Sequence, residues 1–192
     1  MLRTKIKEDD ITRRVKEVFT LDVDEITFEP HDIIPLGFQL LCIVGSSGSG
    51  KSILLSEYGT ESIPKWDDRP ICSHFDSYED AEERLLAVGL SSIPAWLLPY
   101  HLLSTGQQYR ARVARTIKDN AVFDEFTSYL DRSTAKGLAV SLSRYIRKNK
   151  LKGVVVCTPN YDIVPYLEAD IVYDTDLKTR KELKKTNPVL KI

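Results

Sequence analysis

An eight-residue loop, GSSGSGKS at positions 45–52, constrains the fold more than any other feature of this 192-residue chain. It fits the pattern G-x-x-x-x-G-K-[ST] at every defined position. The run FQLLCIVG (38–45) before it is almost wholly apolar, which is typical of a strand buried on both faces of a parallel sheet. A helix is predicted to follow, from Ser52 to about Tyr58. Strand, glycine loop and helix in this order predict a phosphate-binding loop.

The residue types of this loop suit a bound polyphosphate. Its glycines allow tight turns that point backbone N–H groups at phosphate oxygens, and the following helix presents its positive end. Lys51 supplies a compact cation for the β- and γ-phosphates, and Ser52 supplies a hydroxyl ligand for Mg²⁺. By itself the motif indicates only a nucleotide-binding protein. We expect contacts with the nucleotide from Gly45, Ser46, Ser47, Gly48, Ser49, Gly50, Lys51, Ser52 and Ile53.

The rest of the pattern predicts an α/β fold. Further buried strands are expected at 121–126, 153–158 and 170–174, and strand-like alternation begins at FTLDVDEITF (19–28). Strands that alternate with helices favour a mainly parallel sheet flanked by helices. The expected helices span 9–18, 78–89, 104–118 and 133–149.

Two carboxylates end one of the predicted strands. The run AVFDEF (121–126) leads from apolar residues into Asp124 and Glu125, at the edge of a parallel sheet where ligands bind. Asp124 is predicted to hold Mg²⁺, directly or through water, and Glu125 to polarise an attacking water. The alternative is a pair of solvated acids.

The segment LSTGQ (103–107), followed by QYRARVART, resembles the LSGGQ signature of ABC ATPases, with Thr105 in place of the first glycine. The order of the other segments also resembles this family: the glycine loop comes first, then the signature, the Asp-Glu strand, and SYLDR (128–132), which looks like the family's D-loop. The resemblance extends from about residue 19 to about residue 175. It implies a P-loop NTPase fold of ABC type, with a small antiparallel β part and a shortened helical subdomain.

The resemblance also implies how the site is completed. In this family the signature binds the ATP held by the opposite subunit, so that two ATP molecules lie in a head-to-tail dimer. Ser104, Gly106, Gln107 and the D-loop Asp131 are then expected to contribute to a partner's nucleotide site. An adenine-stacking aromatic residue is expected upstream of the loop, and Phe19 is the candidate; the alternative is a core residue. Ser104 can also be read as the simple N-cap of a surface helix.

The sequence departs from the family at three places. The family's switch histidine is missing, because Thr158 is followed by Pro159 and Asn160, and this puts fast turnover in doubt. About 50 residues separate Lys51 from the signature, roughly half the usual distance in transporter domains. No Q-loop glutamine is found, and His74 is a weak substitute. The chain looks most like small ATPases related to the ATPase half of ABC–acetyltransferase fusion proteins.

Net charge, cysteine content and the length of apolar runs limit the expected partners and location of the chain. Net charge is −1, so the whole chain has no field that draws it to nucleic acid or lipid, and the three cysteines (Cys42, Cys72 and Cys157) suit a reducing cytoplasm. No run approaches the ~18–20 apolar residues that span a bilayer, so we expect no membrane insertion. We expect one ATPase domain over 1–176, with a helical insert at about 75–102.

A basic tail is expected at 177–192. It could touch nucleic acid or remain solvated. Three functions stay open: an ATP-hydrolysing enzyme in nucleic-acid metabolism or in phage or defence biology, an ATP-gated dimerisation switch, and the ATPase subunit of a transporter with separate membrane subunits. In each, ATP and Mg²⁺ are the expected cofactors. The expected partner is a second copy of the chain, a nucleic acid or another protein. The tail's basic residues are Lys178, Arg180, Lys181, Lys184, Lys185 and Lys191.

Overall fold

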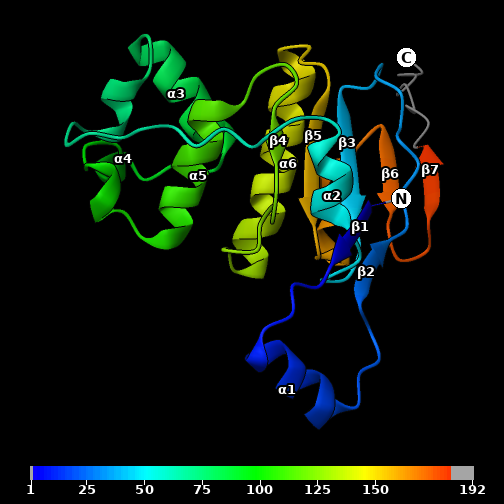
Figure 1. The fold of residues 1–192 in the computed structure, drawn as a ribbon. Coiled ribbons are helices and arrows are strands. Elements are labelled where there is room, and N and C mark those ends of the chain that lie inside the picture. Colours follow the sequence, from blue (N-terminus) through cyan, green and yellow to red (C-terminus); the bar gives the residue numbers. More distant parts are fainter. Residues whose placement is uncertain (1, 183–192) are drawn as a thin grey trace. The chain divides into compact units, whose positions relative to one another are not determined.

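The computed structural model describes residues 2–182 and divides into two compact units after Asp32 (Figure 1). In the first unit, strand β1 (Leu2–Lys5) pairs antiparallel with strand β2 (Glu25–Phe28). Helix α1 (Asp10–Phe19) lies between them in the sequence, and Asp9 caps it by accepting a hydrogen bond from the Thr12 N–H at 2.7 Å. This small antiparallel pair was expected from the sequence.

The boundary between helix and strand in this unit differs from the prediction. The alternation from residue 19 predicts a strand, whereas Phe19 is the last residue of α1. Thr20 follows with a φ of 52°, in the left-handed conformation that commonly ends helices. The predicted strand start was therefore wrong, and the strand is confined to Glu25–Phe28.

The second unit is built on a five-stranded sheet in the order β4-β5-β3-β6-β7. All neighbours are parallel except β6 and β7, as expected for a mainly parallel sheet. Val44 at the end of β3 pairs with Thr158 on one side and Asp174 on the other, so three strands end at one edge. The strands are β3 (Leu40–Val44), β4 (Val122–Phe123), β5 (Val154–Thr158), β6 (Ile171–Asp174) and β7 (Thr179–Glu182).

Strand β3 is buried on both faces, as its apolar sequence predicts. Leu40, Cys42 and Val44 belong to the core on one face, while Leu41 and Ile43 belong to the core on the other. This alternation follows from the two-residue period of a strand. The sheet therefore has helices on both sides.

Helix α2 (Lys51–Ser56) covers one face, and the larger helices cover the other. Helix α3 (Tyr78–Ala87) packs against α5 (Thr105–Thr116) and α6 (Arg132–Lys148), and in Figure 1 α3, α4 and α5 gather beside α6. The predicted helices at 104–118 and 133–149 are confirmed. The short helices are α4 (Ile93–Trp96), α7 (Val164–Leu167) and the 3₁₀ turns η1 (Ile71–His74), η2 (Tyr100–Leu102) and η3 (Tyr161–Ile163).

Two segments differ from the sequence prediction. The strand predicted at 121–126 is only Val122–Phe123, because Glu125 and Thr127 have positive φ angles of 48° and 68° and turn the chain out of the sheet. Residues 179–182, which were expected in the basic tail, form the edge strand β7. Lys184, Lys185 and Lys191 lie outside the described residues. Within residues 2–182 no helix is both long and apolar enough to cross a membrane.

Candidate functional site

The glycine loop joins the end of β3 to the start of α2, in the strand–loop–helix context that its sequence predicts. Gly45 is required by its surroundings, because a Cβ atom there would lie 2.1 Å from the Thr175 hydroxyl oxygen. Gly50 has a φ of 87° and directly precedes the helix, a conformation that side chains disfavour. The loop is therefore a compact turn that ends at a helix N-terminus.

Lys51 is held inside this loop. Its side chain is only 5% exposed, and its Nζ donates a hydrogen bond to the carbonyl oxygen of Ser46 at 2.6 Å. A buried ammonium is favourable only where it has such partners, and a phosphate oxygen would be a stronger one. Ser52, in the first turn of α2, is exposed, and Ile53 is partly buried.

Cys157 of β5 marks where the loop and the two acids meet. Its Sγ lies 3.7 Å from the carbonyl oxygen of Lys51. Burial raises the pKa of this thiol, and the negative charges of Asp124 and Glu125 raise it further, while the Lys51 charge opposes them. Cys157 thus contacts both predicted segments at the edge where β3 and β5 end: its Sγ lies near the Lys51 carbonyl, and its own carbonyl oxygen accepts from the N–H of Phe126, the residue after the two acids, at 2.7 Å.

The two acids are adjacent in sequence but differ in their contacts. Asp124 Oδ1 accepts a hydrogen bond from the backbone N–H of Glu125 at 2.9 Å. Glu125, with its positive φ, accepts from the Ser128 hydroxyl through Oε2 at 2.5 Å. Asp124 is partly buried and Glu125 is exposed.

The oxygen atoms of Ser52 and Asp124 fit a hard cation such as Mg²⁺. Oδ2 of Asp124 is free of the Glu125 contact and available to a ligand. Among residues 2–182 no group of three or more His, Cys, Asp or Glu side chains converges to hold a metal. A magnesium ion here would therefore need phosphate and water oxygens as well, which is how Mg²⁺ is usually bound with nucleotides.

The signature segment begins helix α5. Ser104 is its N-cap: its hydroxyl accepts from the Gln107 N–H at 3.4 Å, and the Gln107 side chain accepts from the Ser104 N–H at 3.0 Å. Gly106 packs closely on the D-loop-like segment, because a Cβ there would lie 3.1 Å from the Leu130 side chain. The predicted helix start is confirmed, while the contact with a partner's ATP stays a prediction.

Asp131 and Asn160 lie in the two segments that follow the acids and β5. Asp131 caps α6 by accepting from the Thr134 N–H at 3.0 Å, and hydrogen bonds from the Thr134 hydroxyl and N–H lower the pKa of Asp131. Asn160 stands two residues after Thr158, where the histidine is missing. Its Nδ2 approaches the Thr127 hydroxyl at 3.5 Å, so an amide faces the turn that carries Glu125.

Two other candidates come from different parts of the chain. Phe19 belongs to the first unit, where it is 69% exposed, and its stacking on adenine stays a prediction. His74 packs edge-on against Trp66, with Nε2 3.2 Å from an Asp67 oxygen. Burial lowers the pKa of His74. These contacts give it a packing role near Trp66.

Sequence reasoning missed several polar residues near the acids and the loop. Glu61 pairs with Arg112 of α5 at 3.2 Å, and burial raises the pKa of Glu61, while Arg112 and the Asp124 backbone act in the opposite direction. Thr175 and Asp176 contact the glycine loop from the β6–β7 turn. None of these residues belongs to a motif, and each reaches its partner across at least 50 residues of sequence.

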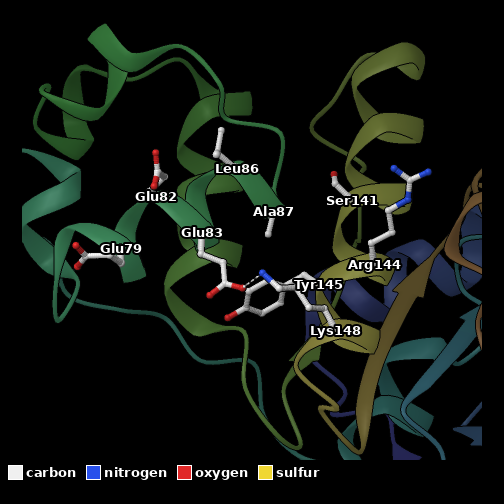
Figure 2. Close-up of a pocket in the computed structure, with 9 residues that line it drawn as sticks. All are labelled: Glu79, Glu82, Glu83, Leu86, Ala87, Ser141, Arg144, Tyr145 and Lys148. Atoms are coloured by element: carbon white, nitrogen blue, oxygen red, sulfur yellow. Dashed lines mark hydrogen bonds and ion pairs between the residues drawn. The ribbon is translucent and has the colours of Figure 1, made fainter.

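A hollow of about 600 Å³ lies elsewhere, between α3 and α6 (Figure 2). Figure 2 shows Glu83 of α3 paired with Lys148 of α6, whose atoms lie 2.9 Å apart. Glu79 and Glu82 line the same hollow. The lining also includes Arg144 and Lys148, so it mixes three glutamates with two basic side chains, and none of the predicted nucleotide-binding residues lines it.

Comparison with solved structures decides the fold. The ATP-binding cassette MJ0796, solved as a dimer bound to ADP and Pi, superimposes with a TM-score of 0.59 and 16% identity over 79% of this chain and 88% of its own. The chain has the fold of an ATP-binding cassette. A second dimeric MJ0796 structure, described as a bacterial ABC transporter cassette, gives a TM-score of 0.55 at 16% identity, again over 79% of this chain and 88% of its own.

A further cassette, CbiO1 from Clostridium perfringens, is described as part of the ABC transporter complex CbiONQ. It gives a TM-score of 0.53 at 16% identity, over 73% of this chain and 75% of its own. No protein-family model and no curated protein matches the sequence. The cassette fold was predicted from the order of the loop, signature and acids.

Proposed function

We propose that this cassette is an ATPase that binds Mg-ATP at residues 45–53 and hydrolyses it slowly. The observation that carries the proposal is that Cys157 contacts the backbone of Lys51 and the backbone of Phe126, which follows Asp124 and Glu125, beside a glycine loop at a helix N-terminus. Backbone N–H groups, a buried ammonium and two carboxylates are the groups that phosphoryl transfer to water requires.

Each residue then has a separate task. Lys51 exchanges the Ser46 carbonyl for phosphate oxygens, and Ser52 and Asp124 hold Mg²⁺, which neutralises charge on the phosphates when bound. Glu125 orients water and takes its proton. Slow turnover is proposed because Pro159 and Asn160 stand where a histidine would contact the γ-phosphate, and a neutral amide stabilises developing charge less than an imidazolium does.

We further propose that two copies pair head to tail. Ser104 and Gly106 at the start of α5 form a second anion-binding helix terminus, and a second copy would place it over the γ-phosphate. Gln107 and Asp131 would lie at the same interface. An ATP-gated switch with negligible turnover is the second candidate, favoured by the amide of Asn160 facing the Glu125 turn.

The proposals for the physiological target have less support than the proposal for ATP hydrolysis. Nucleic-acid metabolism or phage defence is proposed only from the family resemblance and the basic residues near the chain's end. Of these, Arg180 already pairs with Glu182 within β7. A transporter role would require separate membrane subunits.

The binding proposal is tested by Lys51→Ala. Removal of the buried ammonium is expected to weaken ATP binding ~100-fold or more, because a charge-assisted contact with phosphate is lost. Calorimetric titration with Mg-ATP measures this directly. Lys136→Ala is the matched control, since the Lys136 ammonium lies over the Tyr166 ring, 5.3 Å from its centroid. Near-normal affinity in a folded Lys51→Ala protein would refute the assignment.

A further inference from the structure

The β6–β7 turn holds the glycine loop through a carboxylate. Oδ2 of Asp176 accepts from the Ser46 N–H at 2.7 Å, and Oδ1 accepts from the Ser46 hydroxyl at 2.8 Å. One side chain thus binds both donors of the second loop residue. The contact spans 130 residues of sequence.

The neighbouring residue of the turn holds the loop at a second place. The Thr175 and Ser49 hydroxyl oxygens lie 2.6 Å apart, and the Thr175 N–H and hydroxyl both donate to the carbonyl oxygen of Val44, at 2.8 and 3.2 Å. Thr175 is only 3% exposed, and it is the residue that a side chain at Gly45 would strike. Both ends of the loop are therefore fixed to the same turn.

Tyr161 braces the carboxylate from the loop after β5. Its hydroxyl oxygen lies 3.0 Å from Asp176 Oδ2 and 3.1 Å from Asp174 Oδ1. Asp174 Oδ1 also accepts from the N–H groups of Asp176 and Leu177, at 2.9 and 3.0 Å, which fixes the turn. Asp176 is thus held in place by contacts that do not involve the glycine loop.

In this state Ser46 has all three polar groups engaged: its N–H and hydroxyl with Asp176, and its carbonyl with Lys51. Phosphate binding would withdraw Lys51 from that carbonyl, because the ammonium has a stronger partner in phosphate. The Asp176 contacts, with a 3.3 Å hydrogen bond from the Ser49 N–H to the Ser46 carbonyl oxygen, would then keep Ser46 in position. The Asp176 contacts also direct the Ser46 N–H toward the β6–β7 turn.

We propose that Asp176 is a positioning residue for nucleotide binding, which holds the glycine loop in its phosphate-binding shape through Ser46. The inference rests on the proposed ATP site and adds a residue to it. Asp176 acts through hydrogen bonds, so an asparagine can replace it: its amide oxygen accepts from the Ser46 N–H, and its NH₂ donates to the Ser46 hydroxyl oxygen. Alanine removes both contacts.

The test compares Asp176→Ala with Asp176→Asn in the full chain. Asp176→Ala is expected to weaken Mg-ATP binding about tenfold, because two charge-assisted hydrogen bonds that order the loop are lost. Asp176→Asn is expected to recover most of that affinity. Asp162→Ala is the matched control, since it also removes one carboxylate, and that carboxylate pairs with Arg132 at 3.2 Å. Wild-type affinity in Asp176→Ala, or equal losses in both variants, would overturn the proposal.

Hydrogen–deuterium exchange without nucleotide provides a second measurement, which does not depend on ATP binding. The peptide that covers residues 44–52 is expected to exchange faster in Asp176→Ala than in wild type or Asp176→Asn, because the Ser46 N–H loses its acceptor. Unchanged exchange would contradict the proposal that Asp176 holds the glycine loop in place. If wild type failed to bind ATP while exchange followed this pattern, the proposed function would be wrong, but the structural role of Asp176 in holding the loop would be supported.

Discussion

At the scale of single residues, backbone conformation gives the neighbouring acids Asp124 and Glu125 different surroundings. Glu125 has a φ of 48°, so its side chain leaves the direction of the strand, and its carboxylate is held by Ser128. Asp124 stays at the strand end with one oxygen bound to the backbone. Two chemically similar groups thus have different surroundings, which allows one to hold a cation and the other to act on water.

Glu125→Gln tests this division of roles. The amide cannot take a proton from water, so hydrolysis is expected to fall ~10²–10⁴-fold while ATP binding is retained. Phosphate release and nucleotide titration measure the two properties separately. Glu168→Gln is a suitable control, because Glu168 is an exposed glutamate that also has a positive φ, at the end of α7. Equal hydrolysis rates in wild type and Glu125→Gln would rule out the proposed role.

The role of a residue could be predicted from the sequence only where the residue belongs to a recognisable motif. The glycines and Lys51 follow from the pattern of residues 45–52, because their spacing is local. The reason that Gly45 must be glycine is Thr175, 130 positions later, and no local pattern contains that contact. Glu61 and Asp176 were missed for the same reason.

At the scale of elements, β3, β6 and α6 are tied together by Asp170. This carboxylate accepts from the N–H groups of Gln39 and Leu40 at 2.6 and 3.1 Å, and from Arg147 Nη1 at 2.8 Å. Burial alone would raise the pKa of Asp170, but these hydrogen bonds and the Arg147 charge outweigh it and lower the pKa. The start of the glycine-loop strand is therefore fixed to its neighbour and to a helix.

Asp170→Ala is expected to lower the free energy of unfolding by ~2 kcal/mol at pH 7, since backbone donors and Arg147 lose a charged partner. A depressed folded-state pKa contributes stability above the unfolded value of ~3.9, and this contribution disappears as pH falls through the folded pKa. Urea unfolding of both proteins at neutral and acid pH measures the difference. Asp68→Ala, at a side chain that is 98% exposed, should change little. A difference that persists unchanged in acid would contradict this account.

Helices were easier to predict than strand ends. The caps Asp9, Ser104 and Asp131 are local signals, and each begins a helix where expected. The strand predicted at 121–126 was too long. The apolar pattern does not indicate that Glu125 adopts a positive φ, which turns the chain out of the sheet. Strand β7 was missed because its residues are all exposed, so it lacks the apolar alternation that indicates a strand.

At the scale of the whole molecule, one cassette carries the two helix termini that we propose to bind phosphate. One follows the glycine loop at Gly50, and the other begins at Ser104. The order of the motifs predicted this arrangement, because it follows from the sequence alone. The division after Asp32 was not predicted, because the sequence was interpreted as one domain over residues 1–176.

The mass of the Glu125→Gln protein with Mg-ATP, measured by light scattering, tests the central claim most directly. Blocked hydrolysis should trap the pair, so the account predicts about twice the 21.8 kDa of one chain with ATP and a monomer with ADP. Adding Ser104→Arg should restore the monomer without loss of ATP binding, because a bulky side chain would block the partner's γ-phosphate. A Glu125→Gln protein that stays monomeric while ATP is bound would contradict the account.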